Sequence, residues 1–255
     1  MENHLDNLRM SIDVGLTTIE ILSNHLNEEV DQVALAMYRS ILDLSDSIFV
    51  LNANHKMSNS SIMMRALIES YTGFIYLTEK KKLFKQRALS YQYHDYLERK
   101  YAFITQKKLK INEHVNFDQL IDNMNKLLND KRFKSTKKDY RDTKKIVKNH
   151  KWYSLFNGPK SFMGLLDATD SETSMDSRAL YKYLSLDAHG YTSLNSLHYE
   201  NKRFYLKPLL ELEERPFAKY AKVICVVSGL NLVRCRFPDL EYKYIETLES
   251  NGLFP

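Results

Sequence analysis

Glycine and proline are scarce in this chain. Seven Gly and five Pro are present among 255 residues, whereas the two together make up about 12% of an average protein. Sheet-rich folds need frequent turns, and Gly and Pro are main turn formers. The scarcity therefore excludes an all-β sandwich or barrel, and it excludes collagen-like and Gly/Pro-rich disordered chains. Apolar residues at 44% also exclude a mostly disordered chain.

Cysteine is almost absent, with Cys225 and Cys235 as the two examples. They lie ten positions apart in one expected helix, so their Cα atoms would be about 15 Å apart. A disulfide cannot span that distance. Two cysteines also cannot supply the usual structural zinc sites. We expect two buried reduced thiols, which fit a reducing cytosol, and a protein that uses no metal or other cofactor.

Long hydrophobic runs are lacking as well. The most apolar segment, Val223 to Val233, has eleven residues, and a membrane-spanning helix needs about 20. The first ten residues, MENHLDNLRM, resemble neither a signal peptide nor a transit peptide. We therefore expect a soluble, cytoplasmic protein with no membrane association.

Apolar residues recur at helical spacing along most of the chain, and no proline interrupts it before Pro159. Ser58 to Ser61 offers N-cap oxygens for one of the early helices. The spacing predicts helices at about 4–26, 30–54, from the Ser58–Ser61 cap onward, 82–108, 176–189, 192–200, 208–235 and 239–250. An aromatic-rich turn and a short helix are expected over 152–168. The predicted fold class is therefore all-α, a multi-helix bundle with a Lys-rich helical middle section.

The middle section differs in charge from the rest of the chain. Residues 131–151 hold ten basic and two acidic residues, a net charge of +8, although the whole chain carries only +5. We predict N-terminal helices of the bundle in 1–106 and a basic helical insert or hinge in 107–151. Residues 152–255 are expected to complete the same bundle.

Familiar catalytic motifs are missing. The sequence holds no Gly-rich phosphate loop, no G-x-S-x-G, no H-E-x-x-H and no C-x-x-C. Any catalysis must therefore come from side chains that project from helices.

Arg65 and Glu69 form the first candidate constellation. They stand at i and i+4 in a strongly apolar stretch, so they share one helix face. Charged groups in such surroundings are usually buried only when paired. The pair is either an ion pair at the rim of the core, or an arginine aimed at an anion and oriented by Glu69.

Ser185, Asp187 and His189 form the second constellation. Ser185 and His189 also stand at i and i+4, and His189 falls at an expected helix C-terminus, where the helix dipole favours a protonated imidazole. Hydroxyl groups around one imidazole suit general acid–base chemistry. The alternative is a histidine that only caps the last carbonyls of its helix.

Two further candidates involve basic residues. Arg87 and His94 lie two turns apart, and Arg, six residues, His falls within the spacing of the HEPN ribonuclease motif. The alternative is a coincidence, because twelve arginines and eight histidines give about one such match by chance, and position 88 is Ala where that motif usually has a polar residue. The Lys-rich stretch is the other candidate. It could contact the phosphates of a nucleic acid, with Phe133, Tyr140 and Trp152 spaced as stacking groups. The alternative is a charged face that is only solvated. The basic residues assigned to nucleic-acid contact are Lys137, Lys138, Arg141, Lys144 and Lys145.

Three segments resemble a bacterial helical family, the domain-of-unknown-function family 5677. RALIESYTGFIYL, from Arg65, resembles its helix of Arg, three residues and Glu followed by aromatic residues and Leu. YKYLSLDAHG, from Tyr181, resembles its Tyr-x-x-Leu-Ser segment that ends in His-Gly, and WYSLFNGPKSFMGLL resembles its middle. The resemblance covers roughly residues 35–235. It implies a HEPN-like helical architecture and a candidate site of Arg65, Glu69, Ser185 and His189.

The leading hypothesis is a HEPN-like, metal-independent ribonuclease or nucleotide-processing effector, in anti-phage defence or a toxin–antitoxin system. His189 would act as general base on a ribose 2′-hydroxyl, and Arg65 would stabilise the charge that develops on phosphorus. Glu69 and Ser185 would orient these two groups. The alternative is a non-enzymatic helical module that binds a small anionic ligand or a protein partner. RNA, a nucleotide, a protein partner and a second copy of the chain, as a homodimer, are the partners considered.

Overall fold

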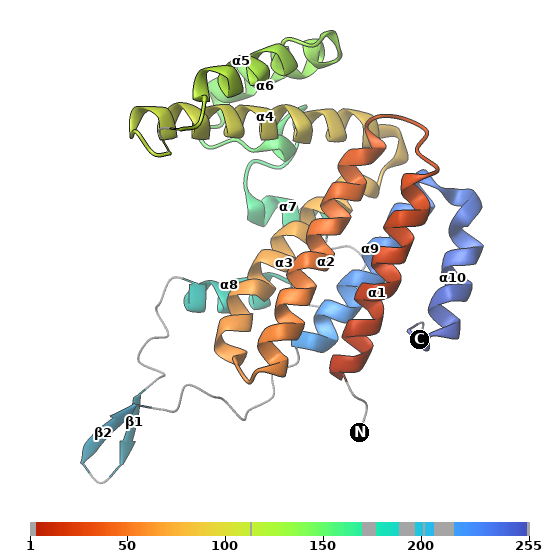
Figure 1. Cartoon of the computed structure of the whole chain (residues 1–255), viewed down its shortest axis with the longest axis vertical. Coiled ribbons are helices and arrows are strands. Elements are labelled where there is room, and N and C mark those ends of the chain that lie inside the picture. Colours follow the sequence, from red (N-terminus) through yellow and green to blue (C-terminus); the bar gives the residue numbers. More distant parts are fainter. Residues whose placement is uncertain are drawn as a thin grey trace. The chain divides into compact units, whose positions relative to one another are not determined.

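The computed structural model describes residues 4–112, 114–169, 177–188, 197–200, 202–206 and 217–253. This part of the chain is almost entirely helical, with one short two-stranded sheet (Figure 1). The expected all-α multi-helix fold is confirmed. The chain divides into two compact units, which we call unit 1 (residues 1–81 and 169–255) and unit 2 (residues 82–168).

Unit 1 is a helical bundle built around one central helix. Its helices are α1 (His4–Ser23), α2 (Asp31–Ala53), α3 (Met57–Thr78), α8 (Ser177–Ala188), α9 (Phe217–Arg236) and α10 (Glu241–Ser250). Helix α9 packs against α1, α2, α3 and α10, and α3 also packs against α8. Small residues on α9, among them Ala221, Ser228 and Gly229, are buried and allow the neighbouring helices to approach closely.

Helix α9 contains the most apolar segment of the sequence and both cysteines. Cys225 and Cys235 are buried free thiols, as expected. Burial raises the pKa of Cys225 to about 11, so this thiol stays protonated at neutral pH. Among the described residues, no helix has the length and apolar character needed to cross a membrane.

Helix α3 begins earlier than the sequence indicated. Its first residue is Met57, and the preceding Lys56 makes no side-chain capping bond. Ser60 and Ser61 are fully buried within the helix, and the Ser60 amide bonds to the Lys56 carbonyl. The prediction that Ser58 to Ser61 caps this helix is therefore wrong. Serine is common both at N-caps and at tightly packed helical positions, so its presence alone did not fix the boundary.

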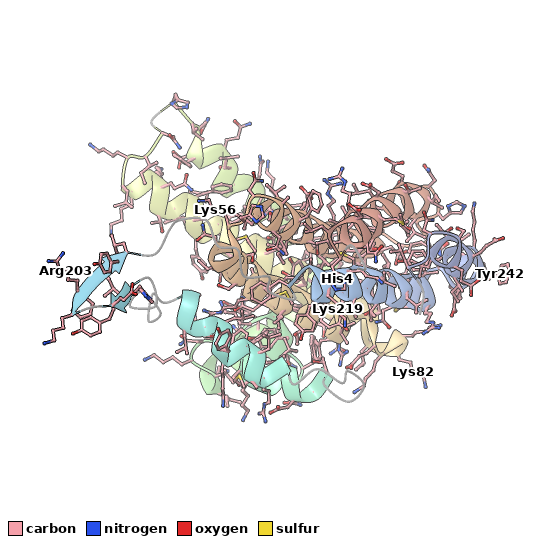
Figure 2. The ribbon with its side chains drawn as sticks, turned by 90° about the horizontal axis from the view of Figure 1, so that it is seen from below. His4, Lys56, Lys82, Arg203, Lys219 and Tyr242 are labelled. Atoms are coloured by element: carbon pink, nitrogen blue, oxygen red, sulfur yellow. The ribbon has the colours of Figure 1, made fainter. Side chains whose placement is uncertain are left out.

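The prediction of a helix at 192–200 is also wrong for residues 197–200, which the structure describes as a strand. Strands β1 (Leu197–Glu200) and β2 (Arg203–Leu206) form an antiparallel hairpin in which Tyr199 pairs with Phe204. Aromatic residues favour strands, and Lys202 adopts a left-handed φ of 63° in the turn. Figure 2 shows Arg203 on this hairpin. The residues on either side, 191–196 and 207–216, lie outside the described part of the chain.

Unit 2 is organised by its longest helix, α4 (Phe84–Lys108). Its other helices are α5 (Phe117–Leu128), η2 (Lys131–Phe133), α6 (Lys134–Ile146), η3 (Trp152–Ser154) and α7 (Phe162–Thr169). Helices α5 and α6 and the short η3 all pack against α4. Phe133 is fully buried and packs with Tyr93 and Leu128. The compact unit therefore extends beyond residues 107–151, because α4 supplies the surface that the basic section covers.

Candidate functional site

The Arg65–Glu69 pair on α3 has the geometry that its spacing predicts. Arg65 Nε lies 3.2 Å from Glu69 Oε1. The Arg65 side chain is 20% exposed and that of Glu69 is 44% exposed, so the pair lies at the edge of the bundle. The expectation that the two residues share one helix face is confirmed.

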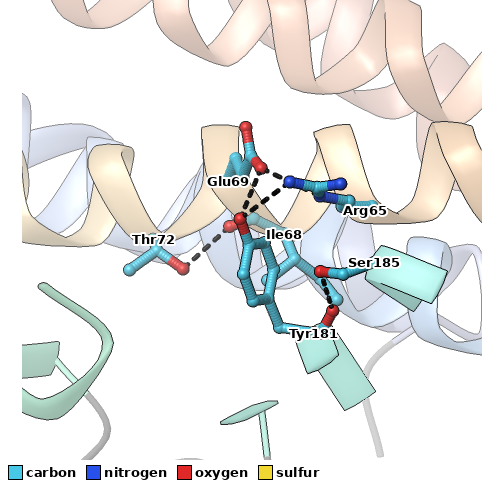
Figure 3. A network of polar contacts seen from close by, with 6 residues as sticks. All are labelled: Arg65, Ile68, Glu69, Thr72, Tyr181 and Ser185. Atoms are coloured by element: carbon cyan, nitrogen blue, oxygen red, sulfur yellow. Dashed lines mark hydrogen bonds and ion pairs between the residues drawn. The ribbon is translucent and has the colours of Figure 1, made fainter. Parts of the chain in front are cut away.

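A third residue, Tyr181 of α8, closes a ring of polar contacts with this pair (Figure 3). Arg65 Nη2 donates to the Tyr181 hydroxyl at 3.1 Å. The same hydroxyl donates to Glu69 Oε1 at 2.9 Å. The Arg65 guanidinium also lies over the Tyr181 ring, 5.1 Å from its centroid, in a cation–π contact. The arginine is thus held by two helices that are far apart in the sequence.

The pKa shifts agree with this hydrogen-bond pattern. Burial opposes the charge on Arg65, but the contacts with Tyr181 and Glu69 outweigh burial and raise the pKa of Arg65. Burial raises the pKa of Tyr181, while its bond from Arg65 acts in the opposite direction. Arg65 is therefore charged and Tyr181 protonated at neutral pH, so the tyrosine hydroxyl has a proton to donate to Glu69.

Ser185 stands one turn after Tyr181 on α8. Its hydroxyl donates to the Tyr181 carbonyl at 2.7 Å, a bond within the helix (Figure 3). Since Tyr181 contacts Arg65, the structure brings the helix of Ser185 against the helix of Arg65 and Glu69. His189, the side chain of Asp187 and the C-terminal end of this segment lie outside the described residues. The role of Ser185 in orienting His189 therefore stays a prediction.

Tyr181 was not among the site residues expected from the sequence. A usable signal was present, because Tyr181, Ser185 and His189 follow each other at intervals of four. Residues at that spacing share a helix face. The contact with Arg65, however, joins positions 116 apart, and no local pattern predicts it.

The second pair, Arg87 and His94, lies on α4 and therefore in unit 2. Arg87 is buried, with 8% of its surface exposed. The His94 side chain is 13% exposed, and its Nε2 lies 3.8 Å from Glu98 Oε1. Burial lowers the pKa of His94 despite the opposing effect of Glu98. The imidazole is therefore neutral at pH 7, and a role for this pair stays a prediction.

The basic residues selected from the sequence lie on α6. Lys145 pairs with Asp142 at 2.9 Å, and Lys137 donates to Asn129 Oδ1 at 2.7 Å. Lys138, Arg141 and Lys144 are exposed. Within the described part of the chain, no three His, Cys, Asp or Glu side chains are grouped so that they could share a metal ion.

The aromatic residues of the basic stretch point to the core of unit 2. Phe133 is fully buried, and its ring packs 5.6 Å from that of Tyr93. Tyr140 also packs on Tyr93 at 5.6 Å, and Trp152 packs edge-on against Tyr91 at 5.3 Å. The prediction that these rings stack on bases is wrong for Phe133, because its side chain is fully buried against α4 and cannot reach a base.

Replacing Tyr181 by Phe is expected to lower the free energy of unfolding by about 0.5–1.5 kcal/mol, the usual net worth of hydrogen bonds of this kind. The ring would stay in place, so its contact with Arg65 would be kept. Urea unfolding measures the change. Tyr183→Phe is the matched control, because Tyr183 lies on the same helix and is 54% exposed. An equal loss in both variants would contradict a specific role of the Tyr181 hydroxyl.

Comparison with known proteins identifies one related family. The model of a family of unknown function, DUF5677, matches residues 31–204. No curated protein matches the chain, and no solved structure matches it. The matched region contains Arg65, Glu69, Tyr181 and Ser185. Because it also covers more than half of the chain, the chain belongs to the domain-of-unknown-function family 5677.

Proposed function

We propose that the protein is a HEPN-like, metal-independent ribonuclease whose site is formed by α3 and the end of α8. One observation carries this proposal. The Arg65–Tyr181 bond joins the helix of the Arg65–Glu69 pair to the helix of Ser185, which leads along the chain to His189. The Arg65–Glu69 pair and Ser185, selected separately from the sequence, thus belong to helices in direct contact.

The proposed reaction is an intramolecular transesterification of RNA. His189 takes the proton of a ribose 2′-hydroxyl, and the 2′-oxygen attacks the adjacent phosphorus. The bond from phosphorus to the 5′-oxygen breaks, this oxygen takes a proton from water, and the hydroxide that remains takes the proton held by His189. The products are a 2′,3′-cyclic phosphate and a 5′-hydroxyl.

Arg65 supplies the positive charge that this reaction needs at phosphorus. Its guanidinium stabilises the negative charge that develops on the phosphate oxygens. Glu69 and Tyr181 hold the guanidinium from two sides, which reduces the reorganisation required during the reaction. Ser185 orients His189 in this scheme.

The cellular setting is part of the same proposal. HEPN-like proteins often act in anti-phage defence or in toxin–antitoxin systems, and often as homodimers. We place the protein in the cytoplasm, where the two buried thiols of α9 would stay reduced.

The decisive test is cleavage of a fluorescent RNA in buffer that contains a chelator. His189→Ala and Arg65→Ala are each expected to slow cleavage at least 100-fold, within the usual range for acid–base groups and charge stabilisers. Lys243→Ala, an exposed position on α10, is the control and should cleave at the wild-type rate. His94→Ala discriminates between sites, since a loss there would move the chemistry to α4.

A different result would favour the non-enzymatic alternative. Saturable binding of a nucleotide without any product, lost in Arg65→Ala, would make the Arg65 cluster a site for an anionic ligand. A His189→Ala protein that cuts RNA at the wild-type rate would remove His189 from the mechanism.

A further inference from the structure

The two units carry opposite net charges. Unit 2 contains twenty basic and nine acidic residues, a net charge of +11 in 87 residues. Because the whole chain is only +5, the residues of unit 1 sum to −6. The net charge of the whole chain therefore conceals a separation of charge between the two units. Such a field attracts polyanions to unit 2.

Helix α6 concentrates this charge on one side. At 100° per residue, the six basic residues of α6 fall within an arc of about 120°. These residues are Lys134, Lys137, Lys138, Arg141, Lys144 and Lys145. The opposite side faces the core of unit 2, where Thr136 is buried and Tyr140 is half-buried. The helix therefore presents a continuous basic stripe while its other side is packed.

Acidic groups do little to neutralise this stripe. Asp139 points away from it and accepts bonds from the Phe156 amide at 2.7 Å and the Thr143 hydroxyl at 3.2 Å. Lys145 pairs with Asp142. Lys134, Lys138 and Lys144 form no ion pair with a carboxylate in the described ranges of the chain.

Most of these charges do not stabilise α6 itself, and only Lys144 and Lys145, in its last turn, lie where the helix dipole favours basic residues. Like charges three or four positions apart destabilise a helix by about 0.2–0.5 kcal/mol per pair, and α6 contains several such pairs. Lys134 is in its first turn, where the helix dipole favours acidic residues, and no acidic residue is present there. Basic residues that mostly weaken their own helix are consistent with a surface that binds a negatively charged partner.

The positions of the aromatic residues in unit 2 limit how this surface can recognise the bases of a nucleic acid. Base stacking needs exposed rings beside the basic groups. In unit 2, Phe133 is fully buried, and Tyr140 and Trp152 pack against tyrosines of α4. The stripe therefore offers charge and hydrogen-bond donors but no stacking ring of its own.

We infer that the basic stripe of α6 docks the phosphodiester backbone of RNA through charge, without reading its bases. The choice of RNA as the polyanion rests on the proposed function. The stripe would capture the substrate in a sequence-independent way, which leaves any selectivity for the cleavage position to the reactive site.

The test measures the affinity of the full-length chain for 2′-O-methyl RNA oligonucleotides of several sequences by fluorescence anisotropy. This RNA lacks the 2′-hydroxyl and cannot be cut by the proposed reaction. A variant with Lys134, Lys138, Arg141 and Lys145 all changed to Glu tests the stripe. The matched control changes four exposed lysines of unit 1 to Glu, with the same change in net charge. These are Lys80, Lys202, Lys219 (Figure 2) and Lys243.

With about four phosphate contacts to a single strand, wild-type affinity should fall roughly 50-fold between 50 and 200 mM salt. The stripe variant should bind at least about tenfold more weakly, with a flatter salt dependence, while the control stays within about threefold. Equal binding by the stripe variant, or an equal loss in the control, would overturn the inference. A strong preference for one sequence would overturn backbone-only recognition.

The result separates this inference from the proposed function. Binding that is lost in the stripe variant, together with uncut natural RNA, would support docking and refute the ribonuclease. Cleavage that persists unchanged in the stripe variant at 150 mM salt would support the ribonuclease and refute docking by α6.

Discussion

Changing Asp31 to Asn is expected to lower the free energy of unfolding by about 2–3 kcal/mol, slightly less than is typical for breaking a fully buried ion pair, because Arg236 also pairs with Glu28. The Asp31 side chain is fully buried, and Arg236, its partner, is only 16% exposed. Removing the negative charge would leave the partly buried guanidinium with Glu28 as its carboxylate partner, and that side chain lies 3.4 Å away and is 40% exposed. Urea unfolding of the variant and the wild type measures the difference.

The geometry explains why asparagine cannot replace this aspartate. Arg236 Nε donates to Asp31 Oδ1 at 2.5 Å. The other oxygen accepts from the amides of Asn27 and Glu28, at 3.1 and 2.9 Å. Both oxygens therefore face donors, and an asparagine would have to turn its NH₂ group toward one of them. The carboxylate ties the loop between α1 and α2 to the end of α9.

Two comparisons make this prediction specific. Asp43→Asn breaks a pair with Arg39 at 2.9 Å in which both side chains are more than half exposed, so its effect should stay below about 1 kcal/mol. In an Arg236→Met background, Asp31→Asn should be much less harmful, because the charge with which Asp31 pairs is already gone. A loss below about 1 kcal/mol for Asp31→Asn in the wild-type background would refute the argument.

The long helices could be predicted because their evidence is local. The expected ranges 4–26, 30–54 and 82–108 agree with α1, α2 and α4 to within a few residues, since apolar side chains recur there at 3.6-residue spacing. The β1–β2 hairpin was missed because four-residue strands are too short for a period to be recognised. Its aromatic residues fit a helix face equally well.

The candidate site was partly predictable for the same reason. Arg65 and Glu69 are one helical turn apart, so their contact follows from spacing alone. The Tyr181 contact depends on which helices pack together, and this is decided by the whole apolar surface of α3 and α8. The start of unit 2 at residue 82 also could not be predicted from local spacing, because it depends on α4 packing against α5 and α6.

Gly229→Ala is expected to destabilise unit 1 by about 1–3 kcal/mol, the range for an overpacked core. A Cβ at this position of α9 would lie 2.1 Å from the Tyr244 hydroxyl and 2.7 Å from the Tyr38 hydroxyl. Tyr38 is fully buried, and its hydroxyl donates to the Cys225 carbonyl at 3.3 Å. Neither ring can withdraw without losing contacts in the centre of the bundle. The gain in helix propensity from Gly to Ala, at most about 1 kcal/mol, opposes the effect without cancelling it.

Gly164→Ala provides the matched control for that prediction. Gly164 is also in a helix, α7, but its nearest neighbour to a new Cβ would be the Ser161 hydroxyl at an ordinary 3.5 Å. This substitution should therefore raise the free energy of unfolding by up to about 1 kcal/mol through helix propensity alone. Opposite signs in urea unfolding would show that Gly229 is required for space and not for backbone freedom. If both substitutions stabilised the protein, the close approach of Tyr38 and Tyr244 to α9 could not be what requires glycine at position 229.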